Sequence, residues 1–194
     1  MENKTLRTFF ATPISAACRQ EINKVVQKLE KDLPSEIRWV NIKKLHITLK
    51  FLGEFKSNDI ELIKNRLESV FSTTRQFDLK FQNLGVFPNE RRPKVVWIGI
   101  ASPAQLKPVF EEIEKATLGL GYPNEVRGFS PHITIGRVKN DKNNQGLLQV
   151  AKVFQNMKFG EICKSHVEGI AFIQSKLTPA GPLYSELFSI GFKQ

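Results

Sequence analysis

The sequence predicts a folded protein of mixed helices and strands that is built from two similar halves. Hydrophobic residues make up 41% of the 194 residues and charged residues 25%, which is typical of a globular protein with a buried core. Strand and helix patterns alternate along the chain, and one four-residue motif occurs twice. A chain of this length forms one domain or two fused halves that share a core.

The first half begins with a strand pattern over residues 5–11 and a helix pattern over residues 14–33, which ends at Pro34. Residues 45–52 alternate between apolar and other side chains, which predicts a strand. The predicted apolar face of this strand consists of Leu45, Ile47, Leu49 and Phe51. Its other face consists of His46, Thr48, Lys50 and Leu52.

The rest of the first half contains a helix pattern at residues 57–71 and strand patterns at residues 77–86 and 95–100. A proline-flanked turn at residues 88–93 separates these two strands. The second half has a similar order of patterns. They are a helix at 103–118, a strand at 132–138, a helix at 146–157, and strands at 167–173 and 184–190.

The motif that occurs twice indicates an internal duplication. His46-Ile47-Thr48-Leu49 and His132-Ile133-Thr134-Ile135 are 86 residues apart. The same offset carries the first-half helix onto the second-half helix, and it carries strand 95–100 close to strand 184–190. A twofold arrangement of such halves places the two motifs face to face.

Each motif combines an acid/base group with a hydroxyl. Residues two apart on a strand point to the same side, so His46 lies beside Thr48 and His132 beside Thr134. Two such strands surround a phosphate with two imidazoles and two hydroxyls. Because histidine has a pKa of about 6.5, one imidazole can take a proton from water while the other, charged, gives one to the leaving oxygen. The pattern predicts phosphodiester cleavage without a metal, with Thr48 and Thr134 binding the phosphate.

These motifs and their surroundings resemble one family, the 2H phosphoesterases. Within it, the sequence is similar to the bacterial and archaeal RNA 2',3'-cyclic phosphodiesterases, also called 2'-5' RNA ligases. The resemblance extends over nearly the whole chain. The segments that carry it are residues 7–11, 45–53, 85–88, 93–97, 129–137 and 181–184.

The resemblance implies an α+β fold with two lobes related by a pseudo-twofold axis, in which residues 1–194 form a single bilobal domain. Each lobe then has an antiparallel sheet with flanking helices, and the active-site cleft lies between the lobes. The implied activity converts a terminal 2',3'-cyclic phosphate of RNA to a 2'-phosphate, without a metal or any other cofactor. In that family the first histidine is the proton donor and the second the proton acceptor, which implies these roles for His46 and His132.

Arg137 matches an arginine that the family uses to hold the phosphate just after its second motif. On a regular strand Arg137 points away from His132, so this role requires a bulge at Gly136 that turns the side chain. Arg127 is a second, weaker candidate. Phe9 or Phe10 could stack a base, although a position in the core is the stronger expectation for both.

The net charge of +10 favours an anionic partner such as RNA. Arg91, Arg92 and Lys94 fall in a predicted loop and are candidates for RNA contact, although runs of charge usually face water. His166 lies near Cys163, but two ligands do not make a metal site, and a surface position is expected. No segment is apolar for long enough to cross a membrane.

Cys18 and Cys163 are too few for a disulfide framework and are expected to be reduced thiols, which predicts a cytoplasmic protein. We expect a monomer that acts on RNA ends or oligonucleotides. The alternatives are joining of a cyclic phosphate to a 5' hydroxyl as a 2'-5' ligase, action on small cyclic nucleotides, and binding of RNA ends without catalysis. Two intact motifs argue against the last. The natural substrate and its length stay open.

Overall fold

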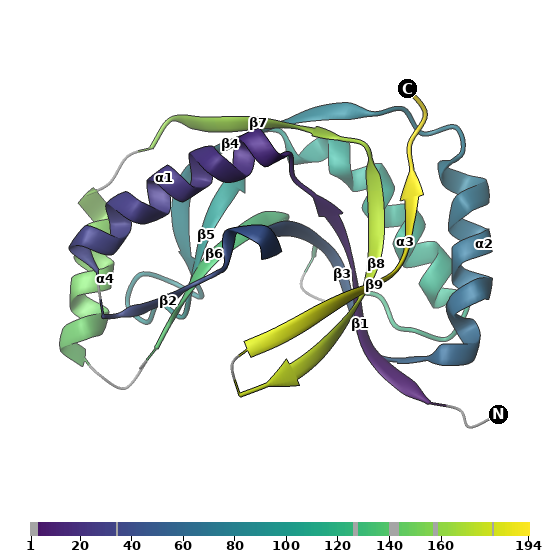
Figure 1. The fold of residues 1–194 in the computed structure, drawn as a ribbon, viewed down its shortest axis with the longest axis horizontal. Coiled ribbons are helices and arrows are strands. Elements are labelled where there is room, and N and C mark those ends of the chain that lie inside the picture. The colour runs from purple at the N-terminus through teal and green to yellow at the C-terminus, as the bar shows by residue number, and fades with distance from the viewer. Residues whose placement is uncertain (1–3, 34, 126–127, 140–143, 157–158, 180) are drawn as a thin grey trace.

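The structure, a computed structural model, describes residues 4–33, 35–125, 128–139, 144–156, 159–179 and 181–194. Over these residues the chain forms a nine-stranded antiparallel sheet and four α-helices (Figure 1). The predicted α+β class is therefore confirmed. None of the described helices combines the length and hydropathy that are needed to span a bilayer.

The helices and strands have the following bounds. The helices are α1 (Ala16–Asp32), α2 (Ile60–Phe71), α3 (Lys107–Leu118) and α4 (Asn144–Asn156). The strands are β1 (Thr5–Pro13), β2 (Ile37–Trp39), β3 (His46–Lys56), β4 (Phe77–Phe87), β5 (Val95–Ile100), β6 (His132–Val138), β7 (Glu161–Val167), β8 (Gly169–Thr178) and β9 (Gly181–Gly191).

The sheet is symmetric about the junction of the two motif strands, β3 and β6. Its order is β7-β4-β5-β6-β3-β1-β8-β9, and β2 is an additional partner of β6. One lobe therefore contains β7, β4, β5 and β6, and the other contains β3, β1, β8 and β9. The pair Ile47–Ile133 joins the lobes, and these two residues occupy the same place in the two motifs. The pseudo-twofold axis thus passes close to this pair.

The predicted equivalence of strand 95–100 with strand 184–190 is wrong. In the sheet β5 lies next to β6 as β1 lies next to β3, so β5 corresponds to β1 rather than to β9. The reason is that strands cross between the lobes. β4 follows α2 in the sequence, yet it pairs with β5 in the other lobe. A constant offset in sequence identified the motif strands but not their neighbours.

Two helices cover each lobe on the outside. α1 packs on β7 and α4 on β4, while α2 and α3 pack together over the lobe of β3 and β9 (Figure 1). Ser15 caps the N-terminus of α1, because its side-chain oxygen accepts a hydrogen bond from the Cys18 N–H. Its buried stripe consists of Cys18, Ile22, Val26 and Leu29. The apolar periodicity of residues 14–33 therefore predicted this helix correctly.

The two cysteines form a disulfide bond, so the expectation of free thiols is wrong. Cys18 on α1 and Cys163 on β7 are 145 residues apart in sequence, but their Cα atoms lie 5.3 Å apart. The packing of α1 on β7 brings them together. Counting cysteines in the sequence does not reveal this contact.

Candidate active site

The two motif histidines lie at the starts of β3 and β6, where the lobes meet. Ile47 pairs with Ile133 in the antiparallel ladder. One step along antiparallel strands in either direction, His46 is opposite Thr134 and Thr48 is opposite His132. All four side chains are partly buried, while the isoleucines between them are in the core. The structure thus brings together the four residues that the motif predicted.

A backbone carbonyl two residues earlier orients each imidazole. His46 Nδ1 lies 2.8 Å from the Lys44 carbonyl oxygen, and His132 Nδ1 lies 2.8 Å from the Ser130 carbonyl oxygen. Because a carbonyl only accepts hydrogen bonds, each Nδ1 carries the proton that it donates. Nε2 is therefore the nitrogen that remains free of this backbone contact in each ring, and the two rings are held in the same way.

Aromatic side chains surround His46. Its ring stacks on Phe9 with the centroids 5.1 Å apart, and the Tyr184 ring lies nearly perpendicular to it with the centroids 5.5 Å apart. The resulting loss of hydration lowers the pKa of His46, because burial disfavours the charged imidazolium. The hydrogen bond to the Lys44 carbonyl opposes this shift, and the positive charge of His132 adds to it.

His132 has a comparable environment on the other strand. The rings of Phe87 and Trp97 lie 5.0 Å and 6.3 Å from it between centroids. Burial lowers the pKa of His132, the hydrogen bond to the Ser130 carbonyl opposes the shift, and the charge of Arg137 lowers the pKa further. Both imidazoles therefore release their protons more readily than an ordinary histidine.

A bulge follows the threonine of each motif. On β3, Thr48 pairs with Ala11 and Lys50 with the adjacent Phe10, so Leu49 is an extra residue. On β6, Gly136 pairs with Val96 of β5 and Thr134 pairs with the adjacent Trp97, so Ile135 is the extra residue. Such a bulge reverses the alternation of the side chains beyond it.

The bulge on β6 turns Arg137 toward the site. Arg137 is exposed, and its charge acts on both His132 and Tyr184. The predicted bulge thus exists, with Ile135 as the extra residue next to Gly136. Gly136 is required because a Cβ atom there would lie 2.5 Å from Ile37 Cγ2 on β2.

The bulge on β3 overturns part of the predicted face assignment. Lys50 was expected on the face of His46 and Phe51 on the apolar face. In the structure Lys50 is 2% exposed, and Phe51 is 57% exposed. Strict alternation predicted the strand but could not show the extra residue, because a leucine at position 49 fits both a regular strand and a bulged one.

The structure places each of the other described candidate residues either in the core or on the surface. Phe9 and Phe10 are buried in the core, as expected, and Phe9 supports His46. His166 lies on the surface, where Nδ1 contacts Asp78 Oδ1 at 2.7 Å, which confirms the predicted surface position. The N–H groups of Arg91 and Arg92 donate to Asn89 Oδ1 in an exposed turn. Arg127 lies outside the described residues.

Tyr184 on β9 is a site residue that the sequence reasoning did not single out. Its ring contacts both His46 and Phe9. Burial raises the pKa of the Tyr184 phenol, and the charges of Arg137 and Arg7 oppose this rise. The only sequence signal for Tyr184 was its place in the family-like segment 181–184.

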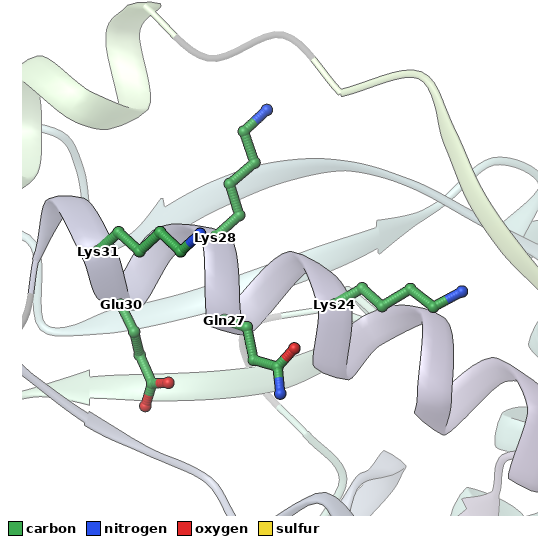
Figure 2. Close-up of a pocket in the computed structure, with 5 residues that line it drawn as sticks. All are labelled: Lys24, Gln27, Lys28, Glu30 and Lys31. Atoms are coloured by element: carbon green, nitrogen blue, oxygen red, sulfur yellow. The ribbon is translucent and has the colours of Figure 1, made fainter.

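An open hollow on the surface of α1 is a separate feature. It is lined by Lys24, Gln27, Lys28, Glu30 and Lys31. Figure 2 shows that the ends of these side chains do not converge on a common point. None of the predicted site residues lines this hollow.

Two His-x-Thr strands that meet at the junction of two pseudo-symmetric lobes define a two-histidine phosphoesterase. The chain belongs to the LigT-like phosphoesterase family, whose model matches residues 13–97 and, a second time, residues 98–184. The boundary between these matches falls within β5, in agreement with the correspondence of β5 and β1.

Two relatives with similar sequences share the same name. A protein of Aquifex aeolicus named RNA 2',3'-cyclic phosphodiesterase is 34% identical over 179 residues, which cover 89% of this chain and 93% of that protein. A protein of the same name from Archaeoglobus fulgidus is 31% identical over 182 residues, with 94% and 98% covered.

Solved structures show the same fold. A protein of Thermus thermophilus has a TM-score of 0.80 at 23% identity, over 96% of this chain and 98% of that one. The structure of LigT from E. coli in complex with 3'-AMP has a TM-score of 0.75 at 21% identity, over 98% and 100% of the two chains.

Proposed function

We propose that the protein is a hydrolase that opens 2',3'-cyclic phosphates at the ends of RNA and leaves a 2'-phosphate. The observation that carries this proposal is the pair of partly buried imidazoles, His46 and His132, placed symmetrically about the Ile47–Ile133 pair. The name shared by the relatives, which are 34% and 31% identical to most of this chain, supports the same substrate.

The proposed reaction uses the two histidines in opposite roles. His132 Nε2 takes a proton from water while the water oxygen attacks phosphorus and forms the new P–O bond. The bond between phosphorus and the 3' oxygen breaks, and His46 Nε2 gives a proton to that oxygen. The products are a 2'-phosphate and a 3' hydroxyl. Solvent then returns a proton to His46 and removes one from His132.

The neighbours of the histidines stabilise the charge that develops on the phosphate. Thr48 and Thr134 lie opposite the two imidazoles, where their hydroxyls can donate to the non-bridging oxygens. The Arg137 guanidinium supplies a positive charge on the His132 side. Together these groups hold the phosphate between the acid and the base.

The lowered pKa of His132 suits its role as the proton acceptor. Because this pKa lies below the ordinary value, His132 is mainly neutral near pH 7, as a proton acceptor must be. His46 must be charged to act as the acid, although its pKa is also lowered in the free protein. A bound phosphate anion favours the imidazolium form, so substrate binding raises the pKa of His46 and opposes the effect of burial.

We also propose that residues 1–194 are one domain that arose by internal duplication, because the family model matches twice and the sheet is symmetric. Both histidines come from one chain, so the proposed mechanism requires only a monomer. The disulfide removes the argument from free thiols for a cytoplasmic location. The proposed RNA substrate is the remaining reason to place the protein in the cytoplasm.

The test is the product formed from a short RNA that ends in a 2',3'-cyclic phosphate. We expect a 2'-phosphate, with a rate that excess EDTA does not change. A 3'-phosphate product would contradict the roles of the histidines. Loss of activity in EDTA that zinc or magnesium restores would contradict the metal-free mechanism. Adding an RNA with a 5' hydroxyl tests for 2'-5' joining in place of hydrolysis.

A further inference from the structure

Lys44 contacts both His46 and the strand that carries Tyr184. It ends the short 3₁₀ turn Ile42–Lys44 that precedes β3, and its carbonyl accepts the hydrogen bond from His46 Nδ1. Its side chain extends to β9, where Nζ donates a hydrogen bond of 2.8 Å to the Pro182 carbonyl and lies 5.9 Å from the centroid of the Tyr184 ring. One residue therefore holds the imidazole with its backbone and a neighbouring strand with its side chain.

The part of β9 that carries Tyr184 belongs to a hairpin that extends past its neighbour in the sheet. β8 pairs with β1 from Ala171 to Gln174, whereas its pairing with β9 continues to Thr178. Residues 175–178 and 181–185 are called the outer hairpin below. In Figure 1 this part projects from the sheet as a two-stranded ribbon. Because such a ribbon is only marginally stable by itself, its position depends on contacts with the rest of the protein.

Two contacts join the outer hairpin to the residues around the first motif. The Tyr184 ring packs against His46 and Phe9, with centroid distances of 5.5 Å and 5.3 Å. The Lys44 ammonium donates to the Pro182 carbonyl in a partly buried hydrogen bond, and a charged donor makes a stronger bond than a neutral one. Pro182 and Tyr184 are two residues apart on β9, so a bond at the first helps to fix the second.

The second motif has a serine where the first has Lys44. Ser130 lies 86 residues after Lys44, and its carbonyl holds the second histidine in the same way. A serine side chain is much shorter than that of a lysine. The aromatic ring of Trp97 on that side is held by its strand, because Trp97 pairs with Gly85 of β4 and with Thr134 of β6. A side-chain contact of the Lys44 type is therefore a feature of the first motif, where the neighbouring ring lies on the outer hairpin.

We propose that Lys44 is a positioning residue that holds the outer hairpin in place and so keeps Tyr184 packed against His46. Lys44 acts through Tyr184 rather than on the phosphate. This inference rests on the proposed function in one respect, which is the role of His46 as the proton donor. It makes the hydration of the His46 imidazole dependent on a contact outside the motif.

The charged and titratable groups around His46 and Tyr184 come from several elements. They are His132 and Arg137 on β6, Arg7 on β1, Tyr184 itself on β9, and Lys44 on the turn before β3. Burial is the largest cause of the lowered pKa of His46, ahead of the charge of His132. Release of Tyr184 exposes the imidazole to water, so it raises the pKa of His46 toward the ordinary value.

The test is an NMR titration of the His46 ring in the free protein, which needs no turnover. We expect Lys44→Met to raise the pKa of His46 and to remove the nuclear Overhauser contact between the rings of His46 and Tyr184. Lys44→Arg retains a cationic donor for the Pro182 carbonyl, and we expect it to restore both. In kcat/KM, Lys44→Met moves the basic limb to higher pH, because the proposed proton donor acts when charged.

Loss of the Lys44 charge also favours a charged imidazole nearby, and a double-mutant cycle separates this effect from the proposed one. In a Tyr184→Ala background we expect Lys44→Met to cause no further shift, because the residue through which Lys44 acts is absent. Lys43→Gln removes an exposed cation next to Lys44, and Leu183→Ala removes an exposed apolar side chain next to Tyr184. These two variants are the matched controls and leave the pKa of His46 unchanged.

An unchanged pKa of His46 in Lys44→Met, or an unchanged contact between the two rings, overturns the proposal. A shift that persists in full in the Tyr184→Ala background also overturns it, because Lys44 then acts by its charge alone. The same holds if Lys44→Arg behaves as Lys44→Met. If the NMR results are as expected but the wild-type protein cleaves no cyclic phosphate, the proposed function fails and the positioning role of Lys44 stands.

Discussion

At the scale of single residues, the site depends on two imidazoles whose protonation is set by their surroundings. Burial lowers the pKa of His46 and of His132, and the carbonyls of Lys44 and Ser130 oppose that shift. The same carbonyls fix Nδ1 as the protonated nitrogen of each ring, which leaves Nε2 for the proposed proton transfer. The main asymmetry is Arg137, whose charge lowers the pKa of His132 in particular.

Replacing Arg137 with glutamine is therefore expected to raise the pKa of His132. A positive neighbour disfavours the imidazolium, so its removal moves the pKa upward toward the ordinary value. In its proposed role of proton acceptor His132 is active when neutral, so the acid limb of kcat/KM is expected to shift to higher pH. NMR titration of the His132 ring in the free protein measures the shift directly, with Lys24→Gln as the control. A fall in the pKa of His132 would refute this assignment.

At the scale of elements, β3 links the first motif to a buried ion pair. Lys50 Nζ lies 2.7 Å from Glu114 Oε1 and donates a hydrogen bond to Thr117 Oγ1 at 2.8 Å, both on α3. Glu114 Oε2 accepts a hydrogen bond from the Glu125 N–H, in the segment that leads to His132. The pair thus connects the strand of one motif to the approach to the other.

Glu114→Ala is expected to destabilise the protein by about 3–5 kcal/mol, because it leaves the Lys50 ammonium buried without a counter-charge. Lys50→Met combined with Glu114→Leu removes both charges, and we expect it to restore most of the stability. Urea unfolding followed by circular dichroism measures both. Equal loss in the single and the double variant would show that packing, rather than the charge, stabilises this contact.

The elements also show where sequence reasoning succeeds and where it fails. Periodicity predicted α1, and the repeated His-x-Thr motif predicted which four side chains meet. The alternation in residues 45–52 predicted β3 but placed Lys50 and Phe51 on the wrong faces. A bulge depends on how a strand pairs with its neighbour, which a single strand does not encode. On β6, Gly136 indicated in the sequence that a bulge could form. On β3, nothing in the sequence around Leu49 indicated one.

At the scale of the whole molecule, helices and strands cross between the lobes. α1 follows β1 in one lobe and packs on β7 in the other (Figure 1). The Cys18–Cys163 disulfide lies at this crossing and closes a long loop of the chain. It therefore holds together the two lobes that supply the two histidines.

Reduction of this disulfide is expected to destabilise the protein by about 2–5 kcal/mol, since a long closed loop restricts the unfolded chain. Thermal unfolding with and without dithiothreitol measures the difference. The double variant Cys18→Ala, Cys163→Ala starts at the lower stability and does not respond to the reductant. Two reactive thiols in the unreduced, denatured protein would show that the bond is not formed in solution.

The central claim is that His46 and His132 act as one acid/base pair, and alanine substitution tests it most directly. The readout is kcat/KM for an RNA ending in a 2',3'-cyclic phosphate. We expect His46→Ala and His132→Ala each to lower it by about 10²–10⁴-fold, with a double variant far from the product of the two effects. The His166→Ala variant changes a histidine on the surface of β7, and we expect its kcat/KM to stay near the wild-type value. Full hydrolysis by either folded motif variant, or an equal loss in His166→Ala, would contradict the account.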